Sequence, residues 1–204
     1  MAMSIYAYLF LLVAVACLRL AEVLLSSRNQ HKLSAKGVSQ TPEPHFRWMV
    51  LFHAGILISA GLEVAVFHRP LIPALAISMG LIFVCATGLR WWVIHVMSEH
   101  WNIRVMNSVD LGVVADGPFR WVRHPNYVAV FVELIALPLI HTAWCTALFG
   151  GVIQVWILAH RLRLEESILM RNSKYVAVMG SKPQFLPRVF AKPSTEASAS
   201  VRND

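Results

Sequence analysis

Long apolar runs constrain the fold of this chain more than any other feature of its sequence. Three of them, at residues 4–25, 48–67 and 71–97, match or exceed the roughly 20 apolar residues that a helix needs to span a bilayer. Two further runs, at 127–140 and 142–160, are shorter and are separated by very little. We therefore predict an all-α fold, a multi-span helical membrane protein with about five transmembrane helices.

Composition and charge agree with this class of protein. Hydrophobic residues make up 57% of the 204 residues and charged residues only 14%, well outside the averages of soluble domains. The net charge of +7 would indicate nucleic-acid binding in a soluble protein. Here, however, the lysine and arginine residues lie between apolar runs, where membrane topology places them. The three cysteines lie inside apolar runs without the spacing of a zinc site. We predict neither a nucleic-acid partner nor a metal.

The distribution of lysine and arginine predicts the orientation in the membrane. Of the 18 basic residues, 15 lie in the segments 26–47 and 98–124 or after residue 160, whereas Arg69 alone lies in the opposite loops. Loops rich in basic residues face the cytoplasm. We therefore expect the N-terminus outside and the C-terminus inside.

The C-terminal part has a different pattern from the spans. Residues 161–178 have the apolar spacing of a cytoplasmic amphipathic helix that Gly180 ends. Residues 193–204 are mostly Ser, Ala and charged residues, and we expect a disordered tail there. The remainder, 1–192, is predicted to be a single membrane domain.

A polar stretch at residues 116–127 is the strongest candidate for a functional site. Gly117-Pro118 is a turn signal, and the proline after His124 keeps that residue out of the α region just before a new helix can begin. The stretch is thus a shaped loop that presents Arg120, Arg123, His124 and Tyr127 at a helix N-terminus. Backbone N–H groups and the helix dipole there favour an anionic group.

Charged residues inside apolar runs are costly and usually face a cavity or a partner. Arg19 and Glu22 are three apart on one helix and are expected to pair. Glu63 lies near the end of its span and is interpreted as structural. Glu133 follows the His124 loop by about two turns of helix. It either pairs with Arg123 or another arginine, or is a desolvated carboxylate that accepts a proton near neutral pH.

A second polar cluster lies where the fifth run ends, and it consists of Arg161, Arg163, Glu165 and Glu166. Arg161 and Glu165 are four apart and share a helix face. Taken alone, the cluster is typical of a solvated surface. If the last span folds back against the His124 loop, the cluster becomes the second wall of one site.

Two motifs together resemble a known family. Gly117-Pro-Phe-Arg-x-x-Arg-His-Pro-Asn-Tyr127, then Arg161-x-Arg-x-Glu-Glu166 and Tyr175, is similar to the C-terminal signature of the isoprenylcysteine carboxyl methyltransferase family. The first half adds a likeness to bacterial members found alongside type III polyketide synthases. The residues that carry it are Glu22, Ser27-Arg-Asn29, Gly37, His45, His53 and Trp101-x-x-Arg104.

The resemblance implies a cytoplasm-facing S-adenosylmethionine pocket, mainly within residues 100–190. The cofactor-binding residues that it implies are Arg123, His124, Asn126, Tyr127, Arg161, Glu165 and Glu166. The acceptor would be the hydroxyl of a long-chain alkylpyrone or alkylresorcinol-type phenol that enters from the bilayer. Implied residues for it are Arg104, Glu22 and His45, and the implied location is a bacterial inner membrane.

Catalytic roles follow from the acidity of the acceptor. A phenol ionises near pH 10 and gains from a base or a nearby cation. We hypothesise that Glu133 or His124 takes its proton, while Arg104 or Arg161 stabilises the oxyanion. A carboxylate acceptor would need only alignment with the methyl group.

Other activities stay open at this stage. Carboxyl methylation of an isoprenylcysteine-like substrate is one, although Asn126 stands where eukaryotic members have serine. A membrane sterol-type reductase that uses NADPH is another, but the Glu165-Glu166 pair suits a cation better than a phosphate. A non-catalytic membrane scaffold is the third.

Overall fold

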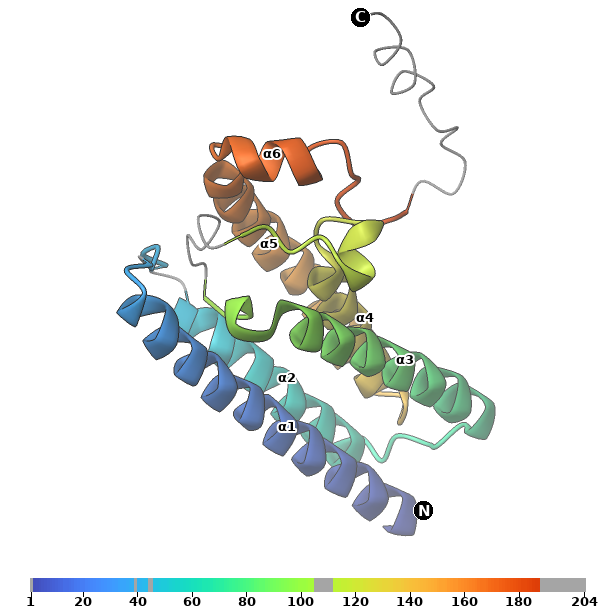
Figure 1. The fold of residues 1–204 in the computed structure, drawn as a ribbon. Helices are drawn as coiled ribbons and strands as arrows, with labels where there is room; N and C mark the ends of the chain where they lie inside the picture. Colours follow the sequence, from blue (N-terminus) through green and yellow to red (C-terminus); the bar gives the residue numbers. More distant parts are fainter. Residues whose placement is uncertain (1, 39, 44–45, 105–111, 188–204) are drawn as a thin grey trace, which may run out of the picture.

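The computed structural model describes residues 2–38, 40–43, 46–104 and 112–187, and their regular structure is helical, as predicted (Figure 1). The helices that are long and apolar enough to cross a membrane are α1 (Ala2–Ala35), α2 (Phe46–Val66), α3 (Pro73–Met97) and α5 (Trp144–Leu169). They make this an integral membrane protein. The short helices η1 (Ser98–His100) and η3 (Gly117–Arg120) lie between α3 and α4.

The fourth apolar run forms α4 (Pro125–Leu139), which is shorter than the other spans. Its 15 residues cover about 22 Å, against roughly 30 Å for the hydrocarbon core. The helix packs chiefly against α3 and α5. The fourth predicted span is therefore a short helix packed among longer ones.

Helix α1 continues well past the expected end of its apolar run near residue 25. It has 34 residues and a length of about 51 Å, so its last turns extend beyond the hydrocarbon core. This extension holds the segment after α3. Ser26 Oγ donates to Asn102 Oδ1 at 2.8 Å, and Asn29 Nδ2 donates to the Trp101 carbonyl at 2.8 Å.

The end of the bundle that carries the N-terminus is held by an apolar core and a few polar contacts. Tyr8, Leu12, Val64 and Leu137 are buried together there. The Tyr8 hydroxyl donates to the Leu137 carbonyl at 3.2 Å. This end also carries the α2–α3 and α4–α5 connections, because the Thr142 hydroxyl donates to the Pro70 carbonyl at 2.6 Å.

The amphipathic helix predicted over 161–178 is divided in two. The first part continues α5 to Leu169, and the second is α6 (Ser173–Met179). The break falls at Asn172, whose side chain accepts a hydrogen bond from the Lys174 N–H as an N-cap, a position that asparagine favours. Helix α6 ends before Gly180, as predicted. The tail predicted over 193–204 lies outside the described residues.

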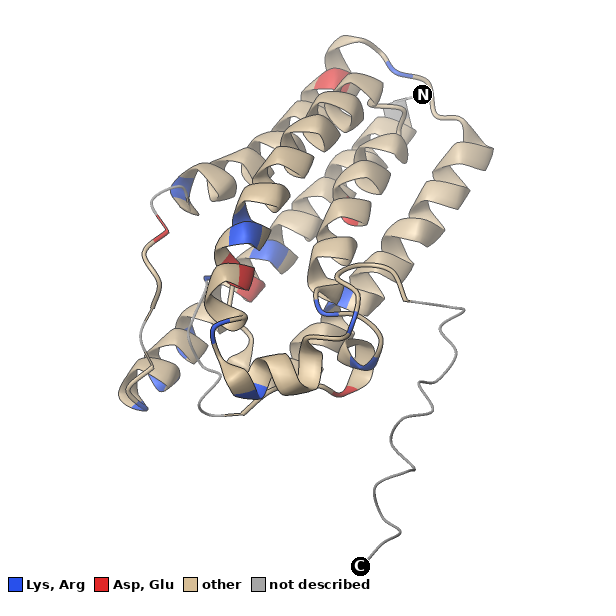
Figure 2. Cartoon of the chain, turned by 90° about the horizontal axis from the view of Figure 1, so that it is seen from above, with Lys and Arg blue, Asp and Glu red and all other residues tan. Residues whose placement is uncertain are grey.

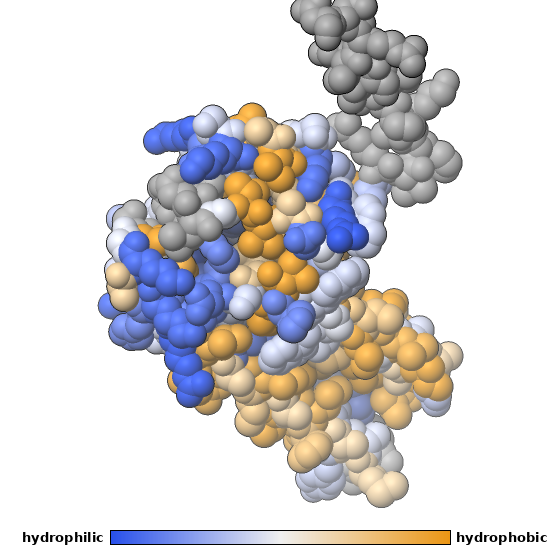
Figure 3. All heavy atoms as spheres, viewed as in Figure 1, coloured by the Kyte–Doolittle hydropathy of each residue, from blue (hydrophilic) through white to orange (hydrophobic). Residues whose placement is uncertain are grey.

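Charge and hydropathy separate the molecule into two halves. Figure 2 shows most charged residues in the half away from the N-terminus. Figure 3 shows hydrophobic side chains over the half near the N-terminus and hydrophilic ones around the opposite end. This division agrees with a bundle set in a bilayer with one polar end, while the orientation in the membrane stays a prediction.

Candidate functional site

The loop before α4 has the shape that its sequence predicts. Gly117 has a φ of +55°, and a Cβ there would lie 2.7 Å from Val96 Cγ2 and 3.0 Å from Trp92 Nε1. Only glycine fits this close approach to α3. His124 precedes the first residue of α4 with a φ of −127° and a ψ of 58°, so α4 begins at Pro125.

The segment after α6 holds this loop by its backbone. The Arg123 and His124 N–H groups donate to the Pro183 and Gln184 carbonyls, each at 2.9 Å. The Lys182 ammonium donates to the Phe119 carbonyl at 2.8 Å, and partial burial lowers the pKa of this lysine. The chain after α6 therefore fixes the position of the His124 loop.

The second polar cluster lies against the loop rather than in solvent. Glu166 accepts a hydrogen bond from His124 Nε2 at 2.6 Å, lies 3.3 Å from Arg123 Nη2 and is 3.4 Å from Gln184 Nε2. Glu165 accepts from the Tyr127 hydroxyl. The two motifs, far apart in the sequence, thus form facing walls of one site.

Arg161 joins three more elements to these walls. Its Nε donates to the Tyr127 hydroxyl at 3.2 Å, and its Nη1 lies 3.0 Å from Met49 Sδ on α2. Its Nη2 donates to the Ile103 carbonyl in the segment after α3. Half-buried among these contacts, the guanidinium is a fixed positive charge at the edge of the site.

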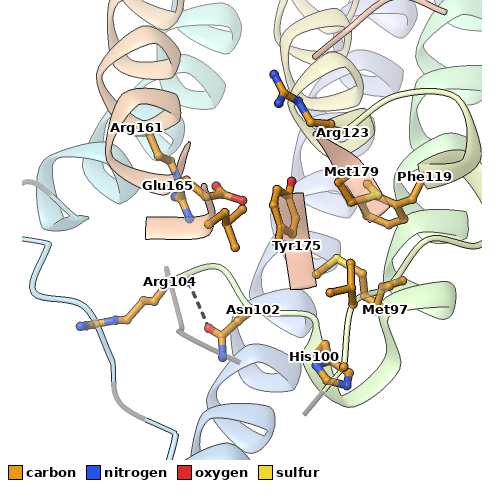
Figure 4. Close-up of a pocket in the computed structure, with 14 residues that line it drawn as sticks. Met97, His100, Asn102, Arg104, Phe119, Arg123, Arg161, Glu165, Tyr175 and Met179 are labelled. Carbon is orange, nitrogen blue, oxygen red and sulfur yellow. Dashed lines mark hydrogen bonds between the residues drawn. The ribbon is translucent and has the colours of Figure 1, made fainter. Parts of the chain in front are cut away.

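A cavity of about 140 Å³ opens between these elements (Figure 4). Its polar lining includes Asn102, Arg123, Arg161, Glu165 and Tyr175. Figure 4 shows Tyr175 between Glu165 and Arg123. Phe119 and the thioethers of Met97 and Met179 form an apolar side. The cavity thus combines cationic, anionic and apolar walls.

Several buried polar atoms around the cavity have no hydrogen-bond partner among the described residues. Arg123 Nε and Asn102 Nδ2 are two such donors, and Asn126 Oδ1 is a buried acceptor in the same state. Leaving such atoms unpaired is costly. Burial and the charges of Glu165 and Glu166 raise the pKa of Tyr175, so its hydroxyl stays a neutral donor. The cavity is therefore built for a polar ligand.

The structure brings most of the predicted cofactor residues together. Arg123, Arg161 and Glu165 line the cavity, and His124, Tyr127 and Glu166 contact them directly. Arg104 lines it as well, but its guanidinium points away and lies 4.3 Å from the centre of the Phe46 ring (Figure 4). His45 falls outside the described residues.

Glu133 and Glu22 lie apart from the cavity lining, in an intramembrane group that we call the charge cluster: Arg19, Glu22, Arg90 and Glu133. Arg90 binds Glu22 through two nitrogens at 2.6 and 3.0 Å. Arg19 binds Glu22 at 2.7 Å, as predicted, and Glu133 at 2.9 Å. The partner of Glu133 is therefore Arg19 rather than Arg123, and its role as a base stays a prediction.

Sequence reasoning missed several residues of the site. Asn102 was not selected, although it lies inside the Trp101-x-x-Arg104 motif. Tyr175 was noted only as part of the signature. Arg90 had a usable signal, because a lone arginine within an apolar run needs a partner.

Residues 77–171, from α3 through the end of α5, match the sequence model of the isoprenylcysteine carboxyl methyltransferase (ICMT) family. The chain is similar to the uncharacterized protein YpbQ of Bacillus subtilis (strain 168), at 24% identity over 165 residues that cover 80% of this chain and 98% of YpbQ. An uncharacterized protein of Haemophilus influenzae is 28% identical over 165 residues, covering 79% of this chain and 95% of that protein. The family match includes both polar motifs that form the cavity walls.

Proposed function

We propose that this protein is an S-adenosylmethionine-dependent methyltransferase that acts on a lipophilic acceptor dissolved in the membrane. One observation carries the proposal. The two motifs meet in a cavity at the polar end of a membrane bundle, where Arg123 and Glu165 offer opposite charges to one ligand. The match of residues 77–171 to the family supports the same activity.

The lining fits the chemical groups of S-adenosylmethionine. Its carboxylate suits Arg123 Nε, a buried donor that lacks a partner among the described residues. Its amine and sulfonium suit the Glu165 carboxylate and the face of the Tyr175 ring. Its adenine suits the apolar side of the cavity, formed by Phe119 and the methionine thioethers.

The residues of the site would then direct a methyl transfer. When bound there, S-adenosylmethionine would supply an electrophilic methyl group with a neutral thioether as its leaving group. Arg161 holds a positive charge at the edge of the cavity, where it stabilises a developing oxyanion. His124, at 2.6 Å from Glu166, is better placed to move the acceptor proton than Glu133, which binds Arg19.

The acceptor class in this proposal is a long-chain alkylpyrone or alkylresorcinol-type phenol, with a functional link to a type III polyketide synthase. It rests on the resemblance of the N-terminal half to bacterial methyltransferases, at residues such as Ser27-Arg-Asn29. Asn29 holds the segment that contributes Asn102 to the cavity, so this motif supports the pocket. An isoprenylcysteine-like carboxylate is the second candidate, because the family match favours it.

Calorimetric titration with S-adenosylhomocysteine tests the proposal. The purified protein in detergent is expected to bind this product, and Arg123→Ala is expected to weaken binding about tenfold or more by removing charged hydrogen bonds. Arg120→Ala is the matched control, because Arg120 lies in the same loop but is exposed, and among the described residues its ion pair is with the exposed Asp116. It is expected to bind like the wild type.

A parallel titration with NADPH separates the alternatives. Binding of NADPH in place of S-adenosylhomocysteine would contradict the proposal in favour of a reductase. Binding of neither would favour a scaffold. If Arg120→Ala and Arg123→Ala lost the same affinity for S-adenosylhomocysteine, binding would depend on the overall charge of the loop rather than on contacts in this cavity.

A further inference from the structure

One face of α5 points into the bundle between α2 and α4. A Cβ at Gly150 would lie 2.6 Å from Ile56 Cδ1 on α2 and 3.4 Å from Leu134 Cδ2 on α4. Arg161, three turns further along α5, contacts Met49 on α2 and Tyr127 on α4. Residues four and eleven apart share a helix face. Gln154 therefore lies on this inward face, between Gly150 and the cavity.

Gln154 is an unusual residue for that position. It is 1% exposed, and its Oε1 accepts no hydrogen bond from any residue that the structure describes. The mechanism proposed above does not use it. A buried amide oxygen without a donor is costly inside a bilayer, where water cannot replace the missing bond. The oxygen is therefore available to a donor supplied by a ligand.

His53 lies at the same depth on α2. It falls between Met49, which contacts Arg161, and Ile56, which faces Gly150. His53 is half-buried, and its Nδ1 lies 2.8 Å from the carbonyl oxygen of Met49, whose thioether contacts Arg161. We call the set formed by His53, Gln154 and the charge cluster the polar layer. Helices α1 to α5 all contribute to it.

The charges of the polar layer are balanced internally. Glu22 forms ion pairs with both Arg90 and Arg19. Glu133 forms an ion pair with Arg19 and accepts a hydrogen bond from the Thr87 hydroxyl at 2.9 Å. Two arginines and two glutamates leave no net charge within the cluster. The cluster thus holds no surplus positive charge for an anionic head group. At Arg19, whose side chain is 27% exposed, the layer reaches the lipid-facing surface.

We propose that the polar layer binds the head group of the acceptor, that this head group carries a neutral hydroxyl, and that Gln154 Oε1 accepts its hydrogen bond. The inference rests on the proposed function and narrows its acceptor class. A carboxylate has no proton to donate to Gln154 and meets no unbalanced cation in the charge cluster. Gln154 is then a specificity-determining residue, and the bilayer holds the alkyl tail.

A matched pair of probes tests this inference by binding rather than by turnover. 4-Nonylphenol and 4-nonylbenzoate share a ring and a tail, but at pH 7 the phenol is neutral and the benzoate is charged. Calorimetric titration in one detergent measures both affinities. The wild type is expected to prefer the phenol, and Gln154→Leu is expected to lose about threefold to tenfold of phenol affinity with benzoate affinity unchanged.

Controls separate the amide from folding and partitioning. Gln40→Leu makes the same change at an exposed glutamine and is expected to bind both probes like the wild type. Since all variants share the same micelles, their differences do not reflect partitioning of the probes. Gln154→Met keeps the length and flexibility of the side chain and serves if the leucine variant does not fold.

The two proposals can fail separately. Unchanged phenol affinity in the Gln154 variants, or a wild type that prefers the benzoate or binds neither probe, would overturn the assignment of the polar layer. Titration of the same samples with S-adenosylhomocysteine reports on the cavity. Loss of that binding in the wild type would contradict the methyltransferase proposal itself.

Discussion

At the level of single residues, the adjacent glutamates of the second motif have different tasks. Glu166 contacts His124, Arg123 and Gln184, and so holds the loop and the chain after α6 together. Glu165 lines the cavity and contacts the Tyr127 hydroxyl. One carboxylate is thus mainly structural and the other faces the cavity.

This difference predicts that substitution of Glu166 mainly affects stability and substitution of Glu165 mainly affects binding. Glu166→Gln is expected to lower the free energy of unfolding by about 1–3 kcal/mol, because a buried charged hydrogen bond is lost. Glu165→Gln is expected to weaken S-adenosylhomocysteine binding with a smaller loss of stability, because a carboxylate facing the ligand amine is removed. Thermal unfolding and calorimetry on the two variants measure both effects. Identical profiles for both would contradict the division of tasks.

Residues with charge and turn chemistry were predictable, whereas buried amides were not. Arg123, His124 and Glu165 stood out because charged side chains and a His-Pro pair interrupt apolar runs. Asn102 and Gln154 carry no charge, and their importance depends on which buried atoms lack partners, which only three-dimensional packing reveals. The same limit applies to Glu133, whose partner Arg19 is 114 positions away in the sequence.

At the level of helices, Glu63 on α2 caps a different helix. It accepts hydrogen bonds from the Cys145 and Thr146 N–H groups in the first turn of α5, at 3.1 and 2.7 Å, and from the Arg69 side chain at 2.8 Å. A carboxylate at a helix N-terminus satisfies unpaired donors and interacts favourably with the dipole. The structural interpretation of Glu63 agrees with these contacts.

Glu63→Gln is therefore expected to destabilise the fold. The substitution keeps the shape but removes the charge that Arg69 and the α5 N-terminus share, and we expect a loss of about 1–3 kcal/mol. Thermal unfolding in detergent measures it. Asp116→Asn is the control, because Asp116 is exposed and forms only a surface ion pair that contributes little. A loss no larger than that of the control would contradict the cap.

The apolar runs predict where helices form, but they do not predict two of the helix ends. The last turns of α1 carry Arg28 and Lys32, polar residues that are as common in loops as in exposed helix. Contacts with the segment after α3, such as that of Asn29, support these turns. The break between α5 and α6 depends on the cap at Asn172, which a helical pattern of apolar residues does not reveal.

At the level of the whole molecule, the cavity lies at one end of the bundle, and the proposed function requires that end to face the compartment that contains S-adenosylmethionine. The end of α1, where Lys32 and the following Lys36 bind Glu99, lies at the same end of the bundle as the cavity. The α2–α3 connection, near Leu71, lies at the opposite end. The charge distribution and the proposed function therefore predict the same orientation.

Cysteine labelling in intact cells tests this orientation. In a variant without the native cysteines at positions 17, 85 and 145, Lys36→Cys and Leu71→Cys each place one thiol at an exposed position. A membrane-impermeant maleimide is expected to label Leu71→Cys in intact cells, and Lys36→Cys only after the membrane is opened. The reverse pattern would place the cavity outside, away from a cofactor made in the cytoplasm, and would contradict both the orientation and the methyltransferase proposal.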